Sequence, residues 1–289
     1  MQNFIIMTDS SCDLPASLAA EMQLTVLPLT LFIGENAYRN TLDESDISYK
    51  EVYTLLRRHV KMKTSAVNQQ AFEQAMEVPL QDGKDILYIG FSSALSGTFN
   101  AARIAAESLA ERYPERKLFC VDSLSASLGQ GLLIYHAWKQ KCAGKSIEEV
   151  RDYVEQTKSH LCHWFTVEDL MFLREGGRIK TTAAVLGTIL SIKPVMHTDD
   201  EGCLTPVDKV RGRKASLRAL MEKARELGTS IANQNVFICH GDCEEDANYL
   251  AGLMRELGVR EIVTHYIGPV IGAHCGPGTV GLFFLGSHR

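Results

Sequence analysis

The sequence contains no long hydrophobic run. No stretch approaches the roughly 20 apolar residues that a membrane-spanning helix requires. The amino terminus opens directly into the short apolar run Phe4–Met7, without a basic segment before it or a cleavage site after it. That arrangement is typical of a first strand rather than of a secretory signal. We therefore expect a cytoplasmic protein without a transmembrane segment, and we leave open a transient contact with a membrane surface.

The sequence also has little net charge. It contains 30 Lys and Arg residues against 35 Asp and Glu residues, for a formal net charge of −5 at pH 7. It has no basic run and no basic helix, which argues against nucleic acid as the main partner.

Several catalytic and metal-binding motifs are absent. The sequence has no Gly-Lys-Ser/Thr loop of the Walker type and no G-x-S-x-G elbow, so neither nucleotide phosphoryl transfer nor a serine hydrolase is supported. The eight cysteines are scattered in mostly apolar contexts, which favours reduced thiols. The segment Cys239–Cys243 lacks a second cysteine pair at zinc-finger spacing, so we expect no metal and no cofactor. Cys275 follows His274 directly, but the side chains of adjacent residues rarely point at one another, so this pair is only a weak indication of a nucleophile and its base.

Short apolar runs alternate with amphipathic stretches through the first half of the chain. This alternation predicts a mainly parallel sheet covered by helices on both faces. The expected strands are Phe4–Met7, Thr25–Leu29, Ile86–Gly90 and Leu118–Val121, and the expected helices are Leu14–Met22, Tyr49–His59, Thr98–Arg112, Leu128–Cys142 and Ile147–His160. We expect Asp13 to cap the first helix, with Pro15 in its first turn.

The pattern changes from about Trp164 onward and predicts a second α/β unit with a mixed sheet. The expected strands are Trp164–Val167, Ile192–His197, Leu204–Val210, Asn235–His240, Glu261–Tyr266 and Thr279–Leu285, with helices near Thr182–Leu190 and at Lys214–Leu227 and Glu244–Leu257. A chain of 289 residues is too long for most single cores. We therefore predict two domains, residues 1–162 with a parallel sheet and residues 163–289 with the mixed sheet.

Hydroxyl side chains gather after several of the predicted strands, where ligands collect in open α/β sheets. The segment Ser92–Thr98 offers four hydroxyls before a helix, whereas capping that helix needs only one, from Ser96. Thr8–Pro15 and Asp122–Ser127 repeat the pattern, and a loop at Lys63–Ser65 adds two more hydroxyls. Since a helix N-terminus favours anions, the first domain is predicted to hold a hydroxyl-lined anion site that needs no cation.

The segment Ile267–Gly281 is the most unusual part of the sequence. It holds five glycines, two prolines and one histidine between two predicted strands. Glycine and proline fix a backbone path that other residues cannot follow, so we interpret the segment as a loop built to hold a ligand near His274. The alternative is a rigid turn whose histidine bonds only to backbone.

Seven motifs in order carry a resemblance to a known family. They are TDSSCDLP (Thr8–Pro15), KTS (Lys63–Ser65), SSALSGT (Ser92–Thr98), EGGRI (Glu175–Ile179), IKP (Ile192–Pro194), KVRGRK (Lys209–Lys214) and IGPVIGAHCGPGTVG (Ile267–Gly281). Together they resemble the DegV-like fatty-acid-binding family from one end of the chain to the other. The sequence differs from the family pattern at two places. It has Ala66–Asn68 where relatives often have Gln-Pro-Ser, and Cys275 where a threonine or another small residue is common.

The resemblance implies two α/β domains with a long-chain fatty acid in a tunnel between them. It implies that Thr64 and Ser96 bind the carboxylate and that His274 lies near the same end. It further implies a carrier without catalytic residues that presents the bound acid to a fatty acid kinase, which forms the acyl phosphate. The secondary candidates for the ligand site are Ser10, Ser65, Ser93, Gly97 and Thr98.

Basic residues flank two glycine-containing segments, at Arg174 and Arg178 and again at Arg211, Arg213 and Lys214. They are either solvated surface charge or a face that docks an acidic partner, with Arg174 and Arg178 as the docking candidates. Two other functions stay open from the residues alone. One is a hydrolase or transferase acting on a small anion at the hydroxyl cluster, and the other is a protein–protein adaptor.

Overall fold

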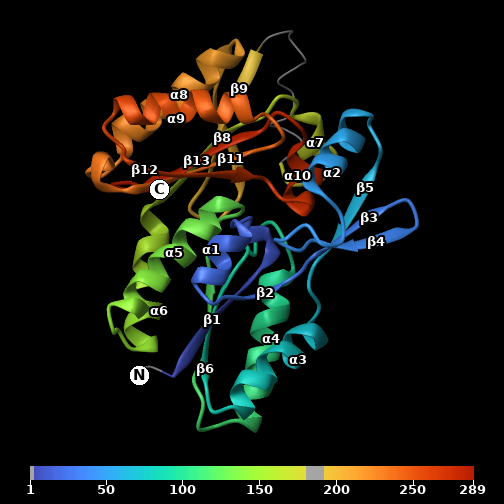
Figure 1. The fold of residues 1–289 in the computed structure, drawn as a ribbon, viewed down its shortest axis with the longest axis vertical. Helices are drawn as coiled ribbons and strands as arrows, with labels where there is room; N and C mark the ends of the chain where they lie inside the picture. The colour runs from blue at the N-terminus through green and yellow to red at the C-terminus, as the bar shows by residue number, and fades with distance from the viewer. Residues whose placement is uncertain (1–2, 180–191) are drawn as a thin grey trace.

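The computed structural model of the protein describes residues 3–179 and 192–289. A parallel sheet fills the lower half of Figure 1 and a mixed sheet the upper half, while a small third sheet projects at one side. The expected helix near Thr182–Leu190 lies outside the described residues.

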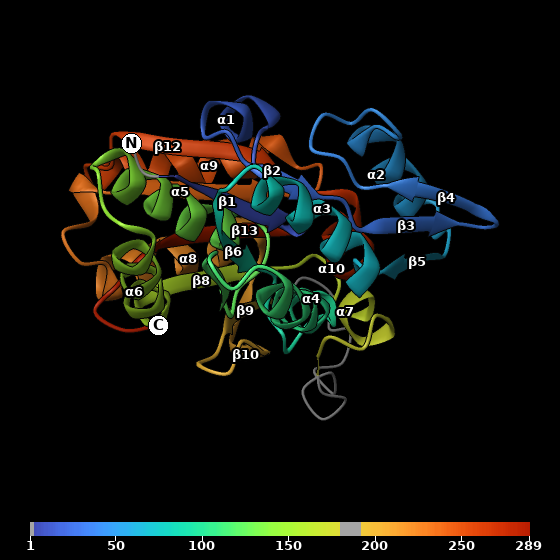
Figure 2. The same cartoon turned by 90° about the horizontal axis from the view of Figure 1, so that it is seen from below.

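The parallel sheet has the strand order β2-β1-β6-β7. Its strands are β1 (Phe4–Asp9), β2 (Thr25–Leu27), β6 (Asp85–Gly90) and β7 (Leu118–Asp122). The covering helices are α3 (Gln69–Gln81), α4 (Thr98–Arg112), α5 (Leu128–Cys142) and α6 (Ile147–Thr157), with the short α1 (Ala16–Glu21) beside them. Figure 2 shows α3 and α4 on one side of the sheet and α5 and α6 on the other. The predicted parallel sheet covered on both faces is therefore confirmed.

The mixed sheet has the strand order β10-β9-β8-β13-β11-β12. Its strands are β8 (Leu161–Thr166), β9 (Ile192–Thr198), β10 (Leu204–Arg211), β11 (Asn235–His240), β12 (Glu261–Tyr266) and β13 (Val280–Leu285). The helices α8 (Arg213–Leu227) and α9 (Glu244–Glu256) cover its outer face, and α5 packs against β8, β11 and β13 on its inner face. Both sheets thus share α5, and the fold class predicted from the sequence is confirmed.

The third sheet was not predicted. It consists of β3 (Thr30–Ile33), β4 (Asn36–Arg39) and β5 (Met62–Ser65), paired antiparallel in the order β4-β3-β5, with α2 (Tyr49–Arg57) between β4 and β5. The prediction of a loop at Lys63–Ser65 was wrong, because this segment forms β5 and Thr64 lies opposite Leu31 of β3. A short polar strand has no hydrophobic run to mark it, and only its partner strand decides its conformation.

The segment Ile267–Gly281 is not a loop throughout, as the sequence analysis expected. Residues Pro269–Cys275 form the helix α10, with Gly268 as N-cap and Pro269 in the first helical position. Gly276 follows with a φ of 79°, which glycine adopts far more readily than other residues. Gly268 and Pro269 therefore begin a short helix and Gly276 ends it. His274 lies in the last turn of this helix.

The predicted cap of the first helix was also wrong. The helix α1 begins at Ala16 with Pro15 at the capping position, and Asp13 ends a 3₁₀ turn at Ser10–Cys12 with a φ of 49°. The Asp13 carboxyl group instead accepts a hydrogen bond of 2.6 Å from the Ser127 hydroxyl, far along the chain.

The hydrophobic core runs without a break between the two large sheets. One cluster contains Leu87 of the parallel sheet, Leu132 of α5 and Phe283 of the mixed sheet. The division into residues 1–162 and 163–289 stays a prediction, and its boundary falls inside β8. Of the helices within residues 3–179 and 192–289, none has both the length and the apolar composition needed to cross a bilayer.

Candidate functional site

A cavity lies between the mixed sheet and the loops that follow the strands of the parallel sheet. Residues from both halves of the chain line it, and most of them are apolar. The apolar lining residues include Leu29, Phe91, Leu95, Ala126, Phe165, Leu173, Leu204, Ile267, Val270, Ile271 and Phe283. These residues come from many separate elements, so no local sequence pattern marks them as one surface. We call this apolar part the interior of the cavity.

Four polar residues form the polar end of the cavity: Thr64, Ser96, Arg178 and His274. The hydroxyl of Thr64 in β5 lies 2.7 Å from Nε2 of His274 in α10, across 210 residues of sequence. Burial, and secondarily the nearby guanidinium of Arg178, lowers the pKa of His274 to about 4. The imidazole is therefore neutral near pH 7 and has one N–H donor and one acceptor nitrogen.

His274 is held close to the turn that follows α7 (Met171–Glu175). A Cβ atom at Gly176 would collide with Nδ1 of His274, so only glycine fits at that position. This close approach explains Gly176, whereas Gly177 has a φ of 70°, a conformation that favours glycine. The close approach also fixes the imidazole beside Thr64.

Ser96 lies at the N-terminus of α4. Its Oγ accepts a hydrogen bond of 3.2 Å from the Thr98 backbone N–H and lies 2.9 Å from the Thr98 hydroxyl. Gly97 is the formal N-cap residue, and α4 extends over 15 residues. The N-terminus of a helix of this length carries a partial positive charge and attracts anions. Ser96 therefore caps the helix and also places its side chain in the cavity wall, beside this charge.

Arg178 is the part of the polar end that the sequence analysis missed. It was expected to be either a solvated surface charge or part of a docking face. Its half-buried side chain instead lines the cavity, and its Nε donates a hydrogen bond of 3.2 Å to the Leu95 carbonyl. Burial lowers the pKa of the Arg178 guanidinium from its usual value, yet arginine stays protonated in proteins. The sequence analysis expected an anion site that needs no cation, but the guanidinium of Arg178 lies in the cavity wall. Arg174, in contrast, is exposed on α7.

The structure brings some of the secondary candidates to the cavity and leaves others outside it. Ser65 and Gly97 lie in the cavity wall. Ser10 is buried elsewhere, where its Oγ accepts hydrogen bonds from the Leu29 backbone N–H and the Asn40 side chain. Ser93 is exposed, and Thr98 is buried behind Ser96. The hydroxyl-rich motifs therefore divide into residues at the cavity and residues that support the loops.

Two hydroxyls in the interior already have protein partners. Ser127 donates to Asp13 at 2.6 Å, and Thr279 donates to the Cys275 carbonyl at 2.9 Å. Burial raises the pKa of the Cys275 thiol to about 12, so it is not a thiolate near neutral pH. His274 bonds to Thr64 rather than to Cys275. This pair therefore lacks the thiolate that nucleophilic catalysis requires.

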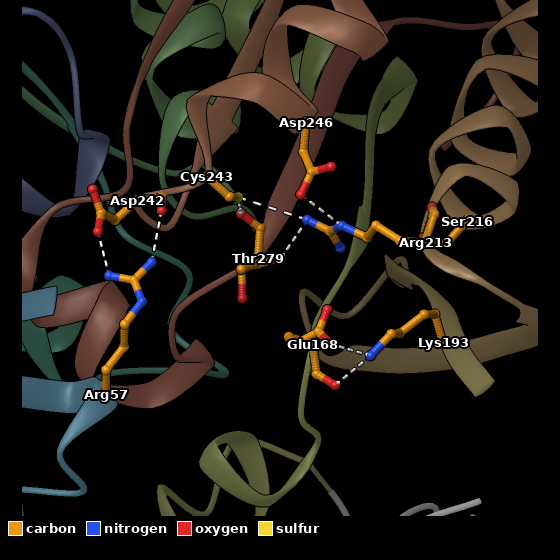
Figure 3. A network of polar contacts seen from close by, with 10 residues as sticks. Arg57, Glu168, Lys193, Arg213, Ser216, Asp242, Cys243, Asp246 and Thr279 are labelled. Carbon is orange, nitrogen blue, oxygen red and sulfur yellow. Dashed lines mark hydrogen bonds and ion pairs between the residues drawn. The ribbon is translucent and has the colours of Figure 1, made fainter. Parts of the chain in front are cut away.

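A polar network braces the chain around α10, and Figure 3 shows it from close by. Arg213 forms an ion pair of 2.8 Å with Asp246 and also donates to the Gly278 carbonyl and to Cys243, so it ties α8 to the turn after α10. Nearby ion pairs join Lys193 to Glu168 and Arg57 to Asp242. Arg213 is thus a structural residue, while Arg211 and Lys214 are exposed.

The segment Cys239–Cys243 does not form a metal site. Cys239 lies in the cavity wall, the ring of His240 packs 4.4 Å from that of Tyr266, and Asp242 is paired with Arg57. Over the described ranges, no group of three or more His, Cys, Asp or Glu side chains is arranged to hold a metal ion.

Known proteins are similar to this chain over nearly its whole length. The family model described as "Uncharacterised protein, DegV family" matches residues 3–287. A DegV domain-containing protein of Clostridium perfringens is 44% identical over 290 residues, which cover 100% of this chain and 99% of that protein.

Two solved structures share the fold over their whole length. A DegV family protein from Thermus thermophilus, described as binding fatty acid, has a TM-score of 0.87 and 28% identity and covers 99% of this chain and 100% of its own. A DegV lipid-binding protein from Thermotoga maritima has a TM-score of 0.86 and 27% identity, with 100% of both chains covered. From the family model and these relatives, which span nearly all of its residues, it follows that the chain belongs to the DegV family.

Proposed function

We propose that this protein binds a long-chain fatty acid in the cavity, with the carboxylate at the polar end and the acyl chain in the interior. One observation carries the proposal: an apolar cavity between the mixed sheet and the loops after the parallel strands ends at Thr64, Ser96, Arg178 and His274. Two of the structural relatives described above are named as fatty-acid-binding or lipid-binding proteins, which supports the same assignment here.

The free energy of such binding would come mainly from the acyl chain. Burying about 15 methylenes at ~0.8 kcal/mol each supplies ~12 kcal/mol before the costs of ordering the ligand. The polar end therefore needs only to orient the carboxylate. Thr64 and Ser96 offer hydroxyl donors, and Arg178 supplies the positive charge that offsets burial of an anion.

The direct test is to denature the purified protein, extract it into organic solvent and identify the extract by mass spectrometry. We expect about one fatty acid per chain. An empty protein that stays empty after incubation with a fatty-acid mixture would overturn the proposal and direct attention to small anionic substrates.

A matched pair of variants then tests the site. Ser96→Ala removes a hydroxyl from the polar end and should weaken fatty-acid binding by about tenfold or more, because hydrogen bonds to charged groups contribute about 1.5–3 kcal/mol. Ser93→Ala removes a hydroxyl from the same loop, but an exposed one outside the cavity, and should leave the affinity unchanged. Equal effects of the two variants would contradict the placement of the carboxylate.

We further propose that the protein carries the acid to a fatty acid kinase rather than transforming it. Support comes from the position of the polar end, where Ser65 and Gly97 are exposed beside the half-buried Thr64 and Ser96. A partner could therefore approach the carboxylate at this surface. Arg174→Glu should reduce transfer of a phosphoryl group to the bound acid by a kinase while sparing fatty-acid binding, and loss of both activities would indicate misfolding instead.

A further inference from the structure

His163 presents an unsatisfied polar atom to the interior of the cavity. It lies in β8 and is 94% buried, since its relative exposure is 6%. Its ring lines the cavity and packs against the rings of Phe165 and Phe283, with centroid distances of 5.5 and 4.7 Å. The surroundings of this imidazole are therefore largely aromatic.

One ring nitrogen of His163 has a partner. Nδ1 lies 3.0 Å from the hydroxyl of Ser125, which is not among the residues that line the cavity. Within residues 3–179 and 192–289, Nε2 has no hydrogen-bond partner, and it is not among the unpaired atoms that are fully enclosed by protein. Nε2 therefore keeps some accessible surface, and because the residue is 94% buried and lines the cavity, that surface faces the cavity.

Burial, with smaller contributions from the charges of Arg289 and His197, lowers the pKa of His163 to about 3. The ring is therefore neutral near pH 7, and Nε2 is either a donor or an acceptor according to the tautomer. The hydroxyls of Ser127 and Thr279, which share the cavity wall, are already bonded within the protein. His163 differs from them because its free nitrogen is available to a ligand.

Strand register places His163 well away from the polar end. Thr279 bonds to the carbonyl of Cys275 at the end of α10, next to His274, and β13 then runs to Phe283, which pairs with His163. Four residues at the ~3.4 Å rise of an antiparallel strand give roughly 14 Å between Thr279 and the Phe283–His163 pair, and His274 lies beyond Thr279, at the end of α10. For a fatty acid whose carboxylate lies at the polar end, this position corresponds to the middle of the acyl chain.

An unbranched alkyl chain would leave Nε2 without a partner in an apolar cavity, and an unpaired buried polar group is costly. A hydroxyl can both donate and accept, so it satisfies Nε2 in either tautomer. We propose that the preferred ligand is a long-chain fatty acid with a hydroxyl group near mid-chain, and that His163 binds this hydroxyl. The proposal rests on the proposed function, because it takes the carboxylate to lie at the polar end.

The test measures the affinities of stearic acid and of a series of hydroxystearic acids that carry the hydroxyl at successive positions. The delipidated full-length protein should prefer a mid-chain hydroxystearic acid over stearic acid by about tenfold. Acids with the hydroxyl next to the carboxylate or at the methyl end should show no such preference. Equal affinities at every position would overturn the inference, since an ordered water would then satisfy His163. Failure of stearic acid and of every hydroxystearic acid to bind would overturn the proposed function itself.

A variant pair assigns the preference to His163. In His163→Phe the preference for the mid-chain hydroxyl should disappear or reverse, while stearic acid still binds. Phe165→Leu alters the same wall without removing a polar atom and should change both affinities by the same factor. A preference that survives in His163→Phe would overturn the inference.

A measurement on the unmodified protein covers the case in which His163→Phe does not fold. The ¹⁵N chemical shift of His163 Nε2 should change when the mid-chain hydroxystearic acid replaces stearic acid in the cavity. An identical shift with both ligands would overturn the inference.

Discussion

The two ends of the cavity are built in different ways. One side of the interior is lined by strand residues, such as His163 and Phe165 of β8 and Phe283 of β13, whose positions follow from strand register, and apolar residues of loops complete it. The polar end is assembled from a short edge strand, a helix N-terminus, a turn after α7 and the last turn of α10. Packing of apolar surface therefore determines the interior, whereas a few contacts between distant segments determine the polar end.

Because of this difference, substitutions in the interior and at the polar end should have different effects. A change in the interior removes packing and should lower the stability of the whole protein. A change at the polar end removes an interaction with the ligand and should alter binding more than stability. Four predictions test this comparison, in order of decreasing effect.

The largest effect is expected from Phe283→Ala. Phe283 is fully buried in the cluster that joins the two large sheets, and truncation of a buried phenylalanine to alanine typically costs about 3–5 kcal/mol. Urea denaturation should show this loss in the free energy of unfolding. A loss below about 1 kcal/mol would mean that the two sheets do not share one core.

The second prediction concerns pH. The folded protein holds the pKa of His274 at about 4, below its ordinary value of 6.5, so the unfolded chain binds more protons between these two pH values. Stability from the neutral His274 is therefore present above about pH 6.5 and is lost as the pH falls toward 4, by up to about 3 kcal/mol.

The measurement for His274 compares two proteins. His274→Asn should lose less unfolding free energy than the wild type between pH 7 and pH 4.5, as measured by urea denaturation. The comparison is needed because burial raises the pKa of Asp13 to about 8, which stabilises the fold as the pH falls and opposes the histidine effect. Identical pH dependence in the two proteins would show that His274 is not held neutral by the fold.

A third, smaller effect is expected from Arg178→Gln. Loss of the guanidinium at the polar end should weaken fatty-acid binding by about tenfold, because a half-buried charge is partly screened by solvent. Arg174→Gln removes an exposed charge a few residues earlier and should leave the dissociation constant unchanged. If Arg174→Gln had the larger effect, the carboxylate would lie outside the cavity.

The smallest effect is expected from Lys193→Met. The Lys193–Glu168 ion pair belongs to the network around α10, but the Glu168 side chain is 52% exposed. Such pairs contribute about 1 kcal/mol or less, and chemical denaturation should show a change within that limit. A larger loss would mean that the network around α10 contributes more to stability than its solvent exposure indicates.

Most of the regular elements could be predicted from the sequence. The apolar runs at Ile86–Gly90 and Asn235–His240 form buried strands, and the predicted helices Thr98–Arg112 and Leu128–Cys142 have the observed bounds. The spacing of apolar residues within each of these segments predicts its secondary structure, because this spacing reflects which faces of the helix or strand are buried. The strand at Met62–Ser65 and the helix at Pro269–Cys275 show little such spacing. They were predicted to be loops, since their conformation depends on partners elsewhere in the chain.

The site was predicted in part. The resemblance led to Thr64 and His274, which the structure joins by a hydrogen bond, but the role of these residues in binding stays a prediction. Arg178 was interpreted as a surface charge, because a sequence does not show whether an arginine beside glycines points inward. Nothing in the pattern around His163 showed that it would line a cavity.

By itself the sequence determined the alternation of strands and helices, the two kinds of sheet and the motifs of the family, because these properties depend on local composition and spacing. Only the tertiary structure decided which hydroxyls reach the cavity, which arginine turns inward and where an unpaired imidazole nitrogen lies. The physical reason is that the cavity forms between segments up to 210 residues apart, and their approach depends on how both sheets pack on α5.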